Sequence, residues 1–127
     1  MSHPSANPGR TGEEIAGLLL ATRGYRLVAR NLRVGRTDVD LVLERGRLLV
    51  AVEVKWRRAN PGDDRLLRAW SPAQRARARS ALLTLMAEFP DGQGRPWRYD
   101  LVTIAESARG WSIEHHPAAG SPRDSWW

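Results

Sequence analysis

Apolar residues near the start of this chain recur at helical spacing, so that three of them share one stripe of a helix: Ile15, Leu18 and Leu19. Such a stripe is typical of an amphipathic helix. Thr11 and Glu14 stand at the spacing of a capping box, which predicts that the helix begins at Thr11 and gives Glu14 a capping role. Gly24 supplies a residue that readily ends it.

The period then shortens to that of strands. Apolar and polar side chains alternate loosely in segments 25–34, 38–44 and 48–56. Turn residues that include Gly35 and Gly46 separate these segments. The pattern predicts three meandering strands.

A second helix and further strands follow. Ser71, Pro72 and Gln74 give a serine cap, a proline in the first turn and a glutamine at the box position, which predicts a helix from here to Glu88. The residues expected to be buried on this helix are Ala76, Leu82, Leu83 and Met86. A fourth strand is predicted at residues 97–105 and an additional one at 111–115.

This order of elements predicts an α/β fold in a single domain, which is what 127 residues can build. The helix between the third and fourth strands is a crossover, so these two strands should pair in parallel within a mixed sheet covered by helices. The ends of the chain, at 1–10 and 117–127, are expected to be flexible, which leaves the domain at 11–116.

The charge of the chain favours a polyanionic partner. Basic residues number 20 against 14 acidic ones, a net charge of +6, and the excess lies in residues 23–79, with 15 basic and 6 acidic side chains. Nucleic acid, above all DNA, is the partner that such a face fits. The alternative is that the arginines reflect genome base composition and are only solvated.

Composition also excludes several classes of protein. Because there is no cysteine, disulfides, thiolate metal sites and cysteine nucleophiles are excluded. The longest apolar run, at 15–21, is far shorter than the roughly 20 residues of a membrane span. Glu13 and Glu14 precede it and have the wrong sign for a signal peptide. A soluble, cytoplasmic protein is expected.

Acidic side chains gather on one face of two central strands, because side chains alternate across a sheet. The apolar face carries Val39, Leu41 and Leu43, then Val50, Val52, Val54 and Trp56. The acidic face carries Asp38, Asp40 and Glu44, then Ala51, Glu53 and Lys55. A turn at Arg45-Gly46 pairs Asp40 with Ala51. Asp38 then pairs with Glu53, so that Asp40 and Glu53 are diagonal neighbours about 7 Å apart.

Two neighbouring carboxylates repel each other, and a divalent cation offsets that cost. Mg²⁺ or Mn²⁺ accepts hard oxygen ligands, so the predicted ligands are Asp40, Glu53 and the backbone carbonyl of Val54. Lys55 is the one lysine in the chain and points to the same side. Its ammonium could position or deprotonate the attacking water, or stabilise charge on a phosphate. The alternative is an ordinary surface ion pair between Lys55 and Glu53.

Six short motifs occur in order between residues 9 and 104: Gly12-Glu13 with Ala16, Gly24-Tyr25, Arg30-Asn31, Asp38-Val39-Asp40-Leu41, Val52-Glu53-Val54-Lys55 with Arg57, and Arg98-Tyr99-Asp100. Together they resemble the YraN-like bacterial family, a branch of the restriction-endonuclease-like nucleases. The resemblance implies a central mixed sheet flanked by helices and a likeness to archaeal Holliday-junction resolvases. It implies a metal-dependent catalytic set at Asp40, Glu53 and Lys55.

The resemblance adds Glu13 to this set, because Glu13 matches a first-helix glutamate of the resolvase-like branch. The alternative for Glu13 is an acid favoured by the helix dipole. The chain departs from the family pattern at Thr37-Asp38, where Gly-Glu is usual, at Gln74-Arg75, where a lysine is usual, and at Ala51, where an aromatic is usual. The first two departures could weaken substrate binding, and none removes the catalytic set.

Arginines near the acidic residues are the predicted nucleic-acid contacts: Arg57, Arg58, Arg75 and Arg79. Each of them could instead be merely solvated. His115-His116 has no partner ligands at useful spacing, so no metal site is expected there. Asp100 is expected to form an ion pair with Arg98 on the same face of its strand.

These features predict a Mg²⁺- or Mn²⁺-dependent endonuclease that hydrolyses phosphodiester bonds. Because no base-reading element is recognisable, selectivity for DNA structure is expected, and a junction-cutting enzyme would act as a symmetric homodimer. The alternatives are a non-catalytic nucleic-acid-binding module and an interaction domain of a DNA-processing complex.

Overall fold

The computed structural model describes residues 8–58 and 70–118. Its helices and strands, in chain order, are α1 (Pro8–Ala21), β1 (Arg26–Val34), β2 (Thr37–Arg45), β3 (Leu48–Arg58), α3 (Pro72–Glu88), β4 (Trp97–Ser107) and β5 (Gly110–His116). The predicted order of elements is confirmed, and the additional strand is present as β5.

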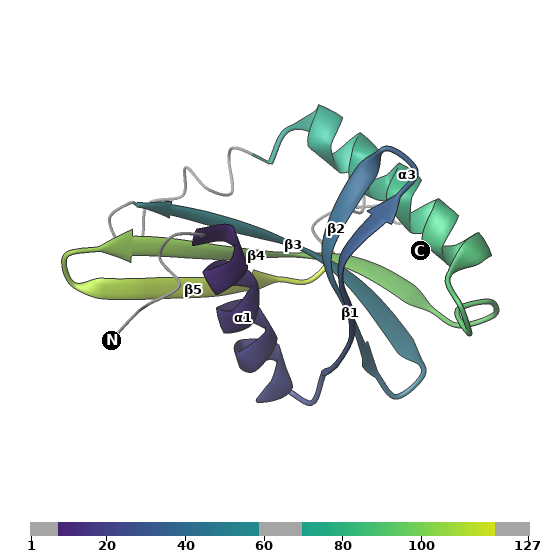
Figure 1. Cartoon of the computed structure of the whole chain (residues 1–127), viewed down its shortest axis with the longest axis horizontal. Helices are drawn as coiled ribbons and strands as arrows, with labels where there is room; N and C mark the ends of the chain where they lie inside the picture. The colour runs from purple at the N-terminus through teal and green to yellow at the C-terminus, as the bar shows by residue number, and fades with distance from the viewer. Residues whose placement is uncertain (1–7, 59–69, 119–127) are drawn as a thin grey trace.

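The five strands form one sheet in the order β1-β2-β3-β4-β5 (Figure 1). All neighbours are antiparallel except β3 and β4, which are parallel because the chain returns through α3 between them. The mixed α/β sheet with flanking helices is therefore the fold that the sequence predicts and that the resemblance to the YraN-like family implies.

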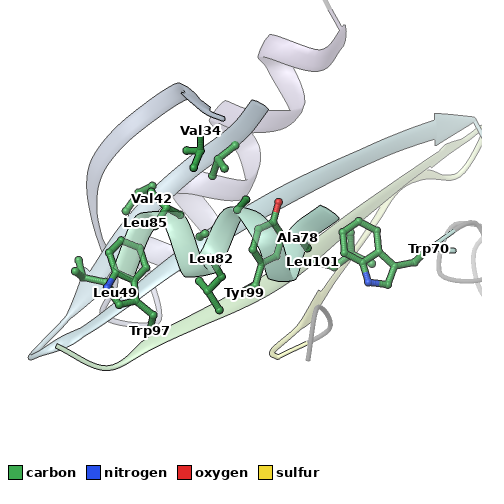
Figure 2. Packing of buried hydrophobic residues seen from close by; sticks show 13 residues of the cluster. Val34, Val42, Leu49, Trp70, Ala78, Leu82, Leu85, Trp97, Tyr99 and Leu101 are labelled. Atoms are coloured by element: carbon green, nitrogen blue, oxygen red, sulfur yellow. The ribbon is translucent and has the colours of Figure 1, made fainter. Parts of the chain in front are cut away.

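Helices α1 and α3 cover opposite faces of the sheet, and each face has its own apolar core. On the face of α1, Ala16 and Leu20 pack with alternate residues of the central strands: Leu41, Leu43, Val50, Val52, Val102 and Ile104. On the face of α3 the core is formed by the residues in between, among them Val42, Leu49, Ala51, Trp97, Tyr99 and Leu101 (Figure 2). The predicted alternation of β3 is confirmed. Val39 is the exception in β2, because it packs in the α3 core and not with Leu41 and Leu43.

The first helix begins earlier and faces the sheet differently from the prediction. It starts at Pro8, so Thr11 lies inside the helix and the predicted cap formed with Glu14 is wrong. The buried line is Gly12, Ala16 and Leu20, whereas Leu18 is 70% exposed. Glu13 adjoins the buried line and is itself partly buried.

The second predicted helix has the predicted start and a different buried face. The Ser71 side chain accepts from the Gln74 amide and the Gln74 side chain accepts from the Ser71 amide, so the capping box is confirmed. The buried residues are Ala78, Ala81, Leu82 and Leu85. Leu83 and Met86 are 53% and 39% exposed and Ala76 is exposed, which makes these three predictions wrong. The buried face of α3 is therefore shifted by about one residue along the sequence from the predicted face, because two alanines of α3 pack on the sheet.

Strand β1 is irregular. A bulge lies between Leu27 and Ala29 in its pairing with β2, and Asn31 has a positive φ of 52°. A left-handed backbone is uncommon for a residue other than glycine, and asparagine is one of the few that tolerate it. The side chain of Asn31 is used in the site described below.

The predicted domain limits fall partly outside the described residues. Residues 8–10 belong to α1, so the predicted flexible arm at 1–10 is too long by three residues, and residues 1–7 and 119–127 lie outside the described part of the chain. Strand β5 ends at His116, the predicted end of the domain. Within residues 8–58 and 70–118, neither helix has the length and apolar character needed to cross a membrane.

Candidate functional site

The site lies where β2 and β3 separate. The two strands pair from Arg45 with Leu48 as far as Leu41 with Val52. The turn is therefore formed by Gly46 and Arg47, and the predicted pairing of Asp40 with Ala51 is wrong by two positions. Because the shift is even, the paired residues Leu41, Leu43, Val50 and Val52 keep their predicted face, whereas Val39, beyond the ladder, does not. The ladder ends one residue short of Asp40 and Glu53, which are near enough for the charge of Asp40 to raise the pKa of Glu53.

Beyond Leu41 and Val52 the ladder ends, and a carboxylate takes the place of the missing backbone acceptor. Oδ2 of Asp40 accepts a hydrogen bond from the Val54 amide at 2.7 Å. Figure 1 shows the β1–β2 hairpin diverging from the carboxyl-terminal half of β3. In a strand, the amide and carbonyl of one residue point toward the same neighbour, so the Val54 carbonyl is directed to the side of Asp40.

Glu13 approaches this split from α1. A Cβ atom at Gly12 would lie 3.0 Å from Cε3 of Trp56 and 3.4 Å from Cγ1 of Val54, so the glycine permits close packing of α1 on β3. Glu13 is thereby brought within hydrogen-bonding range of Asp40. With its amide group turned toward Glu13, Asn31 donates to both carboxylate oxygens at 3.0 and 3.2 Å.

The carboxyl groups of this site resist ionisation. Burial raises the pKa of Glu53 to about 7, with a further rise from the charge of Asp40, against the opposing charges of Lys55 and Arg77. Burial also raises the pKa of Asp40, against the Val54 amide and Lys55. The pKa of Glu13 is raised by burial and then by the charge of Asp40. Negative charge is therefore costly here unless a cation accompanies it.

Lys55 lies beside both carboxylates, on the same face of β3 as Glu53. Its charge is among the causes that lower the pKa of Asp40 and of Glu53. Its Nζ is 5.9 Å from the centre of the Trp70 ring, a cation–π distance. The structure thus brings together four residues that the sequence analysis selected: Glu13, Asp40, Glu53 and Lys55.

The donors fit a small hard cation. Among the described residues, no three His, Cys, Asp or Glu side chains are arranged to hold a metal ion. The set predicted from the sequence is smaller: two carboxylates, of Asp40 and Glu53, and the carbonyl of Val54. Mg²⁺ commonly takes one or two carboxylates and fills its remaining positions with water and substrate phosphate. Asp40 and Glu53 could supply the carboxylates of such a site, and Val54 its carbonyl.

A cavity of about 190 Å³ adjoins Glu53 on the α3 side of the sheet. Its walls come from the β1–β2 turn and the amino-terminal half of α3, and include Arg36, Gln74 and Arg77. It lies at the end of the α3 core that Trp70, Ala78 and Tyr99 form (Figure 2). The four arginines predicted as nucleic-acid contacts are not among the described residues that line it: Arg57, Arg58, Arg75 and Arg79. Arg57 and Arg58 are exposed at the end of β3.

Sequence reasoning missed three residues of this region: Asn31, Arg36 and Arg77. Asn31 stands in the Arg30-Asn31 motif, which was a usable signal. Gln74 and Arg77 are three residues apart and so share a helix face, but the face that α3 turns to the cavity depends on its packing. Arg36 lies in a turn, and no local pattern distinguishes it from the other arginines.

A second polar cluster lies on the α1 face and is separate from the carboxylate site. The buried Asp100 accepts from Nε of Arg98 at 2.7 Å, from Nε2 of His115 at 2.7 Å and from the Ala118 amide at 2.9 Å. Burial alone would raise the pKa of Asp100, but these hydrogen bonds lower it below its usual value. The predicted Arg98–Asp100 ion pair is confirmed. His115 is held in this cluster by its hydrogen bond to Asp100.

Residues 12–104 match the sequence model of the family described as "Uncharacterised protein family UPF0102". A UPF0102 protein of Parvibaculum lavamentivorans is 38% identical over 96 residues, which are 76% of this chain and 70% of that protein. Another, from Chlorobium limicola, is 34% identical over 125 residues and covers 91% of this chain and 92% of its own length. A crystal structure of a repair endonuclease from Pyrococcus abyssi aligns with a TM-score of 0.44 at 14% identity, over 84% of this chain and 39% of that longer chain. A TM-score this low has no bearing on function.

Proposed function

We propose that this chain, which belongs to the uncharacterised protein family UPF0102, is a metal-dependent nuclease that hydrolyses phosphodiester bonds in nucleic acid, most of all in structured DNA. One observation carries the proposal. Asp40 and Glu53 lie near each other where two strands separate, with Lys55 near both, and burial opposes the ionisation of both carboxyl groups. A buried acidic pair beside a lysine is suited to a divalent cation and a phosphate.

In this proposal Asp40, Glu53 and the Val54 carbonyl hold Mg²⁺ or Mn²⁺. When bound, the cation would lower the pKa of a water molecule and neutralise charge on the phosphate. The Val54 amide fixes one oxygen of Asp40 and so orients the carboxylate. The ammonium of Lys55 favours the ionised form of both carboxylates and can donate to a water molecule or a phosphate oxygen. Glu13, held by Asn31, is placed to accept a proton beside Asp40.

The test is a cleavage assay on labelled single strand, duplex, flap, four-way junction and RNA, with Mn²⁺, with Mg²⁺ and with EDTA. The wild type is compared with Asp40→Asn and with Asp91→Asn, a matched change in the exposed turn after α3. Cleavage that needs metal, disappears in Asp40→Asn and persists in Asp91→Asn supports the nuclease. If the wild type binds but cuts none of the substrates, and Asp40→Asn binds equally well, the non-catalytic nucleic-acid-binding module takes its place.

A further inference from the structure

The cavity beside Glu53 contains two arginines that come from different parts of the chain. Arg36 stands in the turn between β1 and β2, and Arg77 stands in the second turn of α3. Both are exposed, so their guanidinium groups are accessible to solvent. Arg77 is also close enough to Glu53 that its charge lowers the pKa of that carboxyl. The cavity therefore has a carboxylate of the candidate site and a positive group of α3 close to each other in its lining.

The described acidic residues around the cavity do not form ion pairs with these arginines. Within residues 8–58 and 70–118, neither Arg36 nor Arg77 forms an ion pair. Asp38 also lines the cavity, but its carboxylate accepts from Nη1 of Arg33 at 3.1 Å. Glu53 is the other acidic residue of the lining.

We propose that Arg36 and Arg77 bind one backbone phosphate of the nucleic-acid strand that reaches Glu53. The inference rests on the proposed function, because it takes the ligand to be the substrate of the same site. Guanidinium groups suit this role, since each offers a planar pair of donors that matches a phosphate. The contact from α3 is then Arg77, and not Arg75 or Arg79 as the sequence suggested.

The volume of the cavity limits which part of a nucleic acid can occupy it. The cavity, of about 190 Å³, is large enough for a phosphate group. The β1–β2 turn and α3 wall the cavity on separate sides. A backbone phosphate can enter such a cavity while its base stays outside it.

The test is the salt dependence of binding to a fluorescein-labelled single strand, measured by anisotropy in EDTA so that no cleavage occurs. Each phosphate contact on a single strand contributes about 0.7 to the slope of log K against log salt. Arg36→Ala with Arg77→Ala should lower the slope by about 0.7 and weaken binding at low salt about tenfold or more. Arg77→Lys should keep the slope, because the charge remains, and lose part of the affinity.

Arg109→Ala is the matched control, because it removes the same charge from the exposed β4–β5 turn, outside the cavity. Its slope should equal that of the wild type. An unchanged slope in the double variant, an equal loss in Arg109→Ala, or no binding by the wild type would overturn the proposal. The result is independent of catalysis. A wild type that cuts nothing but loses slope in the double variant refutes the nuclease alone, and normal slopes with metal-dependent cleavage refute the phosphate contact alone.

Discussion

Replacement of Glu53 by glutamine should stabilise the metal-free protein at pH 8 while it abolishes the proposed cleavage. Glutamine has the shape of a protonated glutamate, so the substitution removes the charge and keeps the packing. In the folded protein the pKa of Glu53 is raised from 4.5 to about 7, chiefly by burial. Each pH unit between folded and unfolded pKa corresponds to about 1.4 kcal/mol. The full difference is therefore about 3 kcal/mol, and solvent screening of this half-buried group reduces the expected gain to about 1–3 kcal/mol.

The sign follows from proton linkage. Between pH 4.5 and about 7 the folded state holds a proton on Glu53 that the unfolded state has lost, so the free energy of unfolding falls as the pH rises through this window. Below pH 4.5 Glu53 is protonated in both the folded and the unfolded state, so its ionisation does not lower the free energy of unfolding. Above pH 7 Glu53 is ionised in both states, and the loss of stability has reached its full size. Glu53→Gln has no such proton, so its advantage over the wild type should be near zero at pH 4.5 and largest at pH 8.

The assay is urea unfolding followed by tryptophan fluorescence in EDTA, for both proteins at pH 4.5 and pH 8. Glu88→Gln, an exposed change at the end of α3, is the control and should shift the free energy of unfolding by less than about 0.5 kcal/mol at either pH. Mn²⁺ should stabilise the wild type at pH 8 and have little effect on Glu53→Gln. If Glu53→Gln proves less stable than the wild type at pH 8, or its advantage is the same at both pH values, then ionisation of Glu53 does not destabilise the folded protein and the reasoning is wrong.

Three further substitutions test the supports of the site. Asn31→Ala should lose about 1–2 kcal/mol, because alanine tolerates a positive φ poorly, and Asn31→Gly should recover stability in thermal melts without recovering cleavage. Gly12→Val should lose about 1–3 kcal/mol in urea unfolding by overpacking α1 on β3, whereas Gly17→Ala, with open space around it, should stabilise by about 0.5–1 kcal/mol. Asp100→Asn should cost about 3–5 kcal/mol at pH 7. Because the pKa of Asp100 is lowered, that difference should vanish as the pH falls through its folded pKa, seen in acid unfolding.

Much of the fold follows from local patterns, as the strands show. Alternation assigned Glu53 and Lys55 to one face of β3 and Val50 and Val52 to the other, and the structure agrees. The register could not be obtained in the same way. A hairpin turn at residues 45–46 and one at 46–47 differ by two positions in pairing, and an even shift leaves all faces unchanged. Alternation therefore identifies the acidic face but not which residue stands opposite Asp40.

The helices show the complementary limit. Apolar periodicity favoured Leu18, Leu83 and Met86 as buried residues, and all three are exposed. Helices α1 and α3 pack on the sheet through small side chains as well as leucines, with Gly12 and Ala16 in α1 and two alanines in α3. Small residues allow close approach but carry little hydrophobic signal in a sequence. The same rotation of α3 decides that Arg77 lines the cavity, so this residue could not be selected without the tertiary structure.

The irregular β1 has a consequence for how this protein behaves at high concentration. An edge strand exposes unpaired amides and carbonyls that can recruit a strand of another molecule, and proteins suppress such aggregation with bulges and charges. The bulge between Leu27 and Ala29 and the left-handed Asn31 interrupt this edge twice within five residues. Arg26, Arg30 and Arg33 add like charges along it. The residue that holds Glu13 in place thus also helps keep one molecule from adding its sheet to the next.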